Sequence, residues 1–200
     1  MNTIKKILKP LYFGFQTIFY DTHIRANGTP KFSFLKKVKI SWRYRLASVF
    51  NLFITNNEKK LLTFKDKHKG KRCFIIGNGP SLNNIDLTKL KDEITFGVNA
   101  IYTNHEKMGF YPNYYVVEDI FVAEDRKNEI NKLKGPQKFF GNYLSYCFNN
   151  NEDVNWINVR FKYDSYKNFP NFSTNLLRQV WTGGTVSYLS LQIAYYMGFK

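Results

Sequence analysis

The sequence predicts an α/β fold in which a mostly parallel sheet is covered by helices on both faces. Three observations predict it. From residue 71 onward, short apolar runs of strand length alternate with longer segments of helical pattern. The first of these runs, Cys73–Ile76, leads directly into a turn rich in glycine and proline. In the final segment, apolar residues recur at helical spacing.

The charge distribution divides the chain into a basic N-terminal region, residues 1–70, and a domain, residues 71–200. The formal net charge is +15, but residues 1–72 carry 17 basic and 3 acidic side chains, whereas residues 73–200 carry 13 and 12. The basic character therefore belongs to the N-terminal region, and a polar linker separates it from a nearly neutral domain.

The N-terminal region is expected to be partly helical and amphipathic. A basic segment with aromatic residues, Lys36–Arg45, runs into the apolar segment Leu46–Ile54. Two interpretations have equal weight: residues 1–60 lie on an anionic membrane surface, or the apolar side packs on the domain. A nucleic-acid partner is not expected, because the sequence carries no recognisable nucleic-acid-binding motif.

The cysteines and the first residues of the chain predict the cellular compartment of the protein. Cys73 and Cys147 are the only cysteines, and neither belongs to a Cys-x-x-Cys pair. Both are interpreted as thiols in a reducing cytoplasm. No signal peptide is visible, and the apolar run near the N-terminus is shorter than the roughly 20 residues of a membrane span. The predicted location is the cytoplasm, with the inner membrane face as the alternative that the basic region raises.

The expected elements of the domain follow one another in chain order. A helix over 122–133 is expected to stop at Gly135-Pro136. Residues 145–178 are ambiguous apart from a short strand. The expected strands are Cys73–Ile76, Ile94–Asn99, Tyr114–Val117, Gln137–Gly141 and Trp156–Arg160, and the expected helices are 84–91, 122–133 and 186–197.

The last helix ends at Gly198, as a helix with a C-terminal glycine does. A parallel unit requires another strand after its crossover helix. The sequence therefore predicts that the C-terminal part of the domain lies beyond Lys200.

The turn after the first strand is the first candidate binding element: Gly77, Asn78, Gly79, Pro80 and Ser81. Glycines let the backbone approach a ligand closely, and Ser81 can cap a following helix. A strand, a turn and a helix N-terminus together suit a phosphate. The alternative is a strand-to-helix connection with no ligand.

Three further features are expected at strand ends, outside which ligands bind in open α/β sheets where the strand order reverses. Asn99 can donate to and accept from a base or ribose. Asp119, beside Glu118, can hold a divalent cation or act on a substrate hydroxyl. The turn of Thr182, Gly183 and Gly184 can offer backbone N–H groups to a second phosphate. The alternatives are that Asn99 closes a turn and that Asp119 and Thr182 cap helices. Together the four features predict a nucleotide pocket in which Asn78 and Gly183 face each other.

These residues resemble a known family. The motifs Gly77-Asn78-Gly79-Pro80-Ser81-Leu82, Gly97-Val98-Asn99 and Pro112-x-Tyr114-Tyr115-Val116-Val117-x-Asp119 are similar to those of the MptE-like family, named for an archaeal 6-hydroxymethyl-dihydropterin diphosphokinase. The opening motif also resembles that of bacterial CMP-sialic-acid-dependent sialyltransferases. Thr182-Gly183-Gly184 differs from the Thr-Ser-Gly of those enzymes, and Asp119 is closer to the metal-using kinase-like branch. The resemblance covers residues 71–200 and implies a Rossmann-like fold and a role in bacterial surface-glycan biosynthesis.

The resemblance leaves three functions open. The first is a glycosyltransferase that uses a nucleotide-sugar donor and a glycan acceptor, with no cofactor. The second is an ATP-dependent diphosphokinase with Mg²⁺ held through Asp119. The third is a non-catalytic nucleotide-binding scaffold. In the sialyltransferases the histidine base lies beyond the point that corresponds to Lys200, and none of His23, His68 and His105 matches it, so no general base is assigned. Asp119 is the catalytic candidate because of its place after a strand.

Overall fold

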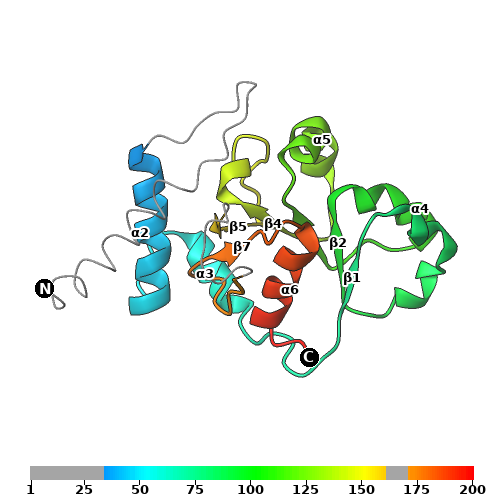
Figure 1. The fold of residues 1–200 in the computed structure, drawn as a ribbon, viewed down its shortest axis with the longest axis horizontal. Helices are drawn as coiled ribbons and strands as arrows, with labels where there is room; N and C mark the ends of the chain where they lie inside the picture. The colour runs from blue at the N-terminus through cyan, green and yellow to red at the C-terminus, as the bar shows by residue number, and fades with distance from the viewer. Residues whose placement is uncertain (1–33, 161–170) are drawn as a thin grey trace, which may run out of the picture.

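A computed structural model describes residues 34–160 and 171–200 (Figure 1). Its main feature is a five-stranded, fully parallel sheet whose strand order follows the chain, β1-β2-β3-β4-β5. The strands are β1 (Phe74–Ile76), β2 (Thr95–Val98), β3 (Tyr114–Val117), β4 (Gln137–Gly141) and β5 (Val154–Ile157). The Rossmann-like α/β fold and the positions of the first four strands are confirmed. The single strand expected over Trp156–Arg160 is wrong, because β5 begins at Val154 and ends at Ile157 and the later residues belong to a second sheet.

A second, two-stranded parallel sheet continues from β5. After Asn158 the chain forms β6 (Val159–Arg160), which pairs with β7 (Val180–Trp181). The Asn158 side chain donates to the Arg178 carbonyl at 2.9 Å and fixes the approach of the later segment. This pairing joins the ambiguous stretch of the sequence to the main sheet.

The helices of the described residues connect or cover these strands. The α-helices are α2 (Phe34–Phe50), α3 (Asn56–Thr63), α4 (His105–Met108), α5 (Ile120–Lys132) and α6 (Val186–Tyr196). Four short 3₁₀ helices accompany them: η1 (Pro80–Asn84), η2 (Leu87–Leu90), η3 (Asn99–Asn104) and η4 (Asn142–Leu144). The helical segment expected over 84–91 consists of the end of η1 and of η2, both 3₁₀ helices. Asn83 and Asn84 have low helix propensity, and the extended Ile85 separates η1 from η2.

Side chains of alternate residues build two cores on opposite faces of the sheet, because successive strand residues point to opposite sides. On one face, Phe96, Val116 and Phe139 pack with residues of α3 and α6. On the other face, Tyr115, Val117 and Phe140 pack with residues of η2, η3, α4 and α5. Both faces of the sheet are therefore buried, which explains the nearly continuous apolar strands.

Helix α6 crosses the first face and contacts β1, β2 and β3. Its predicted apolar residues Val186, Leu189, Ile193 and Met197 are buried, and Gly198 follows with φ 83. At its C-terminal end, the carbonyl of Met197 accepts from His68 N at 2.8 Å. Because His68 precedes β1, this end of α6 lies at the amino edge of the sheet and its first residue points toward the carboxyl edge.

Residues of the basic region also enter the first core. Tyr44 from α2, Leu61 from α3 and Phe64 are buried in it. The boundary between residues 70 and 71 stays a prediction, and residues 1–33 lie outside the described part. No helix within residues 34–160 and 171–200 is both long and apolar enough to cross a bilayer.

Candidate functional site

The predicted binding residues follow three neighbouring strands. Gly77 comes directly after β1, Asn99 after β2 and Glu118 after β3. Parallel pairing of β1 with β2 and of β2 with β3 places these ends at one edge of the sheet. Since neighbouring strands are about 4.8 Å apart, the first and third ends are separated by about 10 Å. The expected reversal of strand order does not occur among these five strands, whose order is sequential.

The Gly77–Ser81 turn is exposed and has ordinary backbone geometry. Neither Gly77 nor Gly79 has a positive φ, and a Cβ added to either would meet no atom within 4 Å. The fold itself therefore does not require glycine at these two positions. The expectation that Ser81 caps a helix is wrong: Gly79 is the N-cap of η1, and no side chain caps it. This 3₁₀ turn is too short to carry the dipole of an α-helix.

Asn99 has two unusual features. Its φ is 50, the left-handed region that non-glycine residues rarely adopt. Its side-chain oxygen, Oδ1, is buried and has no hydrogen-bond partner. The Tyr115 hydroxyl donates to the Asn99 carbonyl and holds the residue in place. Asparagine adopts this region more readily than other non-glycine residues, so the unpaired buried oxygen is the feature that makes Asn99 a candidate functional position.

Thr182 follows β7, and its hydroxyl is also unpaired. The residue is 1% exposed, and Oγ1 has no hydrogen-bond partner. The alternative that Thr182 caps α6 is wrong, because Thr185 is the N-cap and accepts from Ser187 N at 3.3 Å. Leaving such a hydroxyl unpaired costs about 1–3 kcal/mol.

The two glycines after Thr182 are required by the fold. Gly183 and Gly184 have φ 56 and φ 82. A Cβ on Gly183 would also lie 2.1 Å from the Tyr188 ring. A residue with a side chain would therefore be strained at either position. Because α6 runs from the carboxyl edge to the amino edge, this turn lies toward the same edge as Asn99. Whether Asn78 and Gly183 face each other across a pocket stays a prediction.

The two acidic residues after β3 differ in role. Asp119 caps α5, accepting from Phe121 N at 2.7 Å, as its alternative interpretation expected. Burial, and then the neighbouring Asp119 charge, raise the pKa of Glu118 to about 7. The Tyr143 hydroxyl donates to the Glu118 carbonyl at 2.5 Å. A carboxyl with a pKa near 7 is suited to proton transfer at neutral pH. Glu118 is therefore a better candidate than Asp119 for a residue that transfers a proton.

Metal binding at this edge would depend on these two carboxyls. Within residues 34–160 and 171–200, no three His, Cys, Asp or Glu side chains gather so as to hold a metal ion. Mg²⁺ is commonly held by one or two carboxylates together with substrate phosphates. Glu118 and Asp119 fit that smaller requirement, although one Asp119 oxygen already caps α5.

The histidines lie apart from this edge or outside the described residues. His68 contacts the hydroxyl of Tyr114 at 2.5 Å and stacks on Phe199, at the amino edge of the sheet. His105 stacks on Tyr111, with ring centroids 4.6 Å apart. His23 is outside the described residues.

Comparison with protein families provides an independent observation. The family model described as 6-hydroxymethylpterin diphosphokinase MptE-like matches residues 49–200. The chain belongs to the MptE-like family. The match begins within the last turn of α2 and so includes α3, whose residues join the first core. Comparison with curated proteins and with solved structures found no match. The MptE-like family name indicates a transferase-type enzyme.

Proposed function

We propose that this MptE-like protein is a nucleotide-dependent transferase, and specifically a glycosyltransferase that uses a nucleotide-sugar donor in cell-surface polysaccharide or glycoprotein biosynthesis. One observation carries the proposal: Asn99 Oδ1 and Thr182 Oγ1 are both buried and without hydrogen-bond partners. Sequence reasoning placed both residues at strand ends, where α/β folds bind nucleotides. A nucleotide would supply the missing partners.

Each element has a distinct role in this proposal. Backbone N–H groups at the start of α6 and in the Gly77–Ser81 turn bind the donor phosphates and stabilise the leaving-group charge. Asn99 binds the base or the ribose. Glu118 accepts the proton of the acceptor hydroxyl, because a pKa of about 7 leaves a substantial fraction ionised at neutral pH.

The adjacent carboxyls of Glu118 and Asp119 favour one alternative function, an ATP-dependent diphosphokinase. Together with the ATP phosphates they would hold Mg²⁺, which would neutralise phosphate charge when bound. The family name also supports this alternative.

Thermal unfolding with CMP, UDP, GDP or ATP, with and without EDTA, tests the two functions. A bound nucleotide raises the melting temperature according to its concentration relative to Kd. Stabilisation by CMP, UDP or GDP that EDTA does not change is expected. Stabilisation by ATP alone that EDTA abolishes would overturn the sugar-transfer proposal in favour of the diphosphokinase. Stabilisation by no nucleotide would contradict both and favour a non-catalytic scaffold.

We also propose that the protein works on the inner membrane face, where it docks on anionic lipid. Six large apolar side chains on α2 and the loop after it are more than half exposed: Leu35, Trp42, Val49, Phe50, Leu52 and Ile54. The basic side chains of Lys39 and Arg45 lie on the same helix and are exposed. An apolar surface beside positive charge suits an anionic headgroup region.

Sedimentation with vesicles tests this docking. Vesicles containing phosphatidylglycerol should bind the protein more tightly than pure phosphatidylcholine vesicles, and high salt should weaken the binding. A Phe50→Asp variant should bind less. Equal binding to both vesicle types, or binding that Phe50→Asp leaves unchanged, would contradict the proposal.

A further inference from the structure

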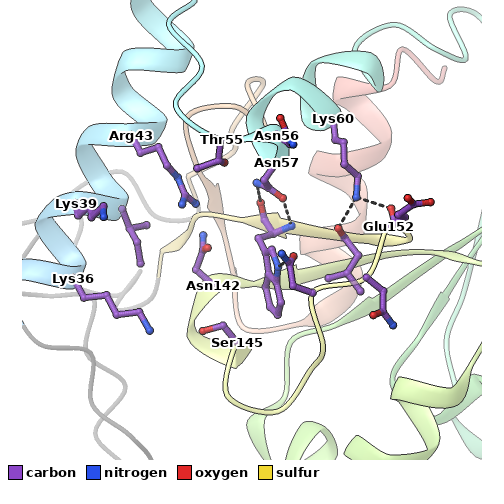
Figure 2. A pocket seen from close by; sticks show the side chains of 15 residues that line it. Lys36, Lys39, Arg43, Thr55, Asn56, Asn57, Lys60, Asn142, Ser145 and Glu152 are labelled. Atoms are coloured by element: carbon purple, nitrogen blue, oxygen red, sulfur yellow. Dashed lines mark hydrogen bonds between the residues drawn. The ribbon is translucent and has the colours of Figure 1, made fainter.

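A second region of the molecule has the properties of a binding site. A cavity of about 900 Å³ lies between α2, α3 and the β5 edge (Figure 2), within the size range of small-molecule sites, about 300–1,000 Å³. It is separate from the residues that follow β1, β2 and β7. Its lining includes Lys36, Lys39 and Arg43 on one wall and Asn56, Asn142 and Ser145 on others.

The wall formed by α2 is positively charged. Lys36, Lys39 and Arg43 are spaced by three and four residues, so they lie on one face of the helix. In Figure 2, Lys36 and Arg43 extend from α2 toward Asn142 and Ser145. Among the described residues that line the cavity, four are basic and Glu152 is the only acidic one, so this part of its lining carries net positive charge.

The other walls offer uncharged hydrogen-bonding groups. Asn56 and Asn151 are exposed side chains that line the cavity. Asn142 Nδ2 donates to Ile157 O and Tyr44 Oη, both at 2.9 Å. The other polar atom of this amide, Oδ1, can accept a hydrogen bond from a ligand. Amide groups of this kind both donate and accept, as recognition of sugar hydroxyls requires.

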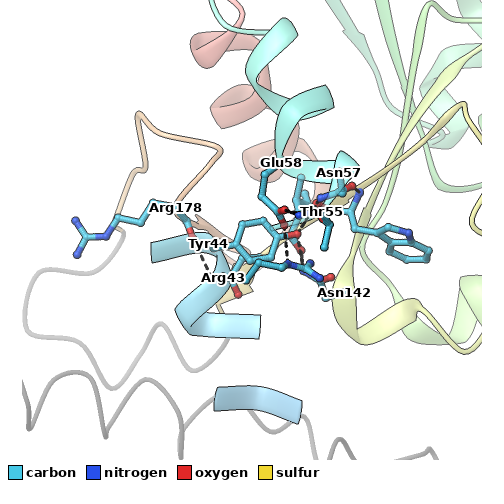
Figure 3. A network of polar contacts seen from close by, with 10 residues as sticks. Arg43, Tyr44, Thr55, Asn57, Glu58, Asn142 and Arg178 are labelled. Atoms are coloured by element: carbon cyan, nitrogen blue, oxygen red, sulfur yellow. Dashed lines mark hydrogen bonds and ion pairs between the residues drawn. The ribbon is translucent and has the colours of Figure 1, made fainter. Parts of the chain in front are cut away.

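A buried polar network holds these walls in fixed positions (Figure 3). Arg43 Nε forms an ion pair with Glu58 Oε1 at 2.6 Å, and Glu58 Oε2 accepts from Thr55 N at 2.8 Å. The Tyr44 hydroxyl donates to the Trp156 carbonyl at 2.6 Å. These contacts tie α2 to α3 and to β5, so the cavity is preorganised.

We propose that this cavity binds a phosphate-bearing sugar, with the phosphate against Lys36, Lys39 and Arg43 and the hydroxyls against the asparagine side chains. Positive charge pairs with phosphate, and the amides match the sugar. Asn142 directly follows β4, which pairs with β3 and ends beside Glu118. Assigning the phosphate-bearing sugar as part of the glycan acceptor rests on the proposed function, whereas the binding itself does not.

Calorimetric titration of the full chain tests the proposal, with glucose 6-phosphate, glucose and inorganic phosphate as probes. Glucose 6-phosphate should bind more tightly than inorganic phosphate and than glucose, and less tightly in high salt. Lys39→Glu should weaken its binding about tenfold or more, because it replaces a charge-assisted contact by repulsion. Arg45→Glu makes the same charge change on another face of α2 and should have little effect.

A second variant separates binding from folding. Asn56→Asp puts a negative charge in the cavity and in the first turn of α3, where an acidic residue favours the helix. It should weaken binding of glucose 6-phosphate while the melting temperature is kept. No binding of glucose 6-phosphate, or equal weakening by Lys39→Glu and Arg45→Glu, would overturn the proposal of a phosphate-bearing sugar.

A short-chain, water-soluble phosphatidylglycerol distinguishes the source of the phosphate, because it can enter the cavity without the membrane surface on which α2 is proposed to dock. If it binds, if Lys39→Glu but not Arg45→Glu abolishes that binding, and if glucose 6-phosphate does not bind, the phosphate belongs to a lipid headgroup and the sugar assignment is overturned. Failure of binding at the cavity can be told apart from failure of the proposed function. Thr182→Val should keep glucose 6-phosphate binding, and Lys39→Glu should keep stabilisation by nucleotide.

Discussion

The side chain of Asn57 pairs with the backbone of Trp156 as a neighbouring strand would. Its Oδ1 accepts from Trp156 N at 2.8 Å, and its Nδ2 donates to Trp156 O at 2.8 Å. Because β5 is at the edge of the five-stranded sheet, these bonds satisfy backbone groups that an edge strand leaves open. One amide thus closes the edge and joins α3 to the sheet.

Replacing Asn57 by alanine should lower the free energy of unfolding by about 1–3 kcal/mol, since it leaves the Trp156 N–H and part of the carbonyl's pairing unsatisfied. Urea unfolding measures the change. Asn56→Ala is the matched control: its side chain is exposed, and the expected change is within about 0.5 kcal/mol. Equal losses in the two variants would show that the pairing contributes nothing specific.

Thr182→Val should separate ligand binding from folding. Without ligand, the free energy of unfolding should be unchanged or rise by about 1 kcal/mol, because the variant removes an unpaired buried hydroxyl. Stabilisation by nucleotide should be reduced or lost. Thr185→Val, which removes the α6 cap, should instead cost about 1 kcal/mol in stability. If Thr182→Val proved as destabilising as Thr185→Val, the hydroxyl would have a structural rather than a ligand partner.

Alanine should be destabilising at one of two glycines and tolerated at the other. Gly183→Ala should destabilise the protein by more than about 1 kcal/mol, because φ is 56 and the Tyr188 ring fills the space of a Cβ. Gly79→Ala should leave the melting temperature nearly unchanged, since the space around it is open. It should reduce stabilisation by nucleotide, because the added methyl group keeps the phosphate away from the backbone. A stable Gly79→Ala protein with full nucleotide stabilisation would remove that turn from the site.

Glu118 should make stability depend on pH. Its pKa is raised from 4.5 to about 7 by burial and by Asp119, so the folded state holds the proton more tightly than the unfolded state. This contribution is fully present below pH 4.5 and is lost as the pH rises through about 7, a loss of up to about 3 kcal/mol. Urea unfolding at pH 5 and pH 8 should show it in the difference between the wild type and Glu118→Gln.

Transferase activity should change in the opposite direction with pH. If Glu118 is the base, the rate rises as the carboxyl ionises, with half of the rise near pH 7. Glu118→Gln should lose most of the activity and keep nucleotide stabilisation. A pH profile unchanged between pH 6 and pH 8 would contradict this role.

The strands were predictable because each is short, apolar and bounded by turn residues. Tyr114–Val117 and Gln137–Gly141 are strands over the residues expected. The connection after β1 was not: Pro80 and Ser81 suggested a helix start, but the asparagines that follow favour a 3₁₀ turn. The asparagine side chains can hydrogen-bond to nearby backbone groups, and this competes with the hydrogen bonds of an α-helix.

The roles at the predicted site depended on tertiary contacts. Glu118 and Asp119 are equivalent in a sequence, yet one is a cap and the other has a raised pKa because burial differs between them. The side-chain oxygens of Asn99 and Thr182 are buried without a hydrogen-bond partner, and this burial also depends on tertiary contacts. Gly183 and Gly184 had a sequence signal that matched their geometry, since positive φ favours glycine. Asp119 also had one, as an N-cap residue before α5.

By itself, the sequence determined the order of strands and helices, the uneven charge and the motifs of the MptE-like family, because these depend on neighbours along the chain. Only the tertiary structure decided which atoms lie buried without a partner and which helix covers each face. It also assembled the basic cavity from α2, α3 and residues near β5, about a hundred positions apart. Separations of that size leave no periodicity to detect, since the contacts form only when the sheet has brought the segments together.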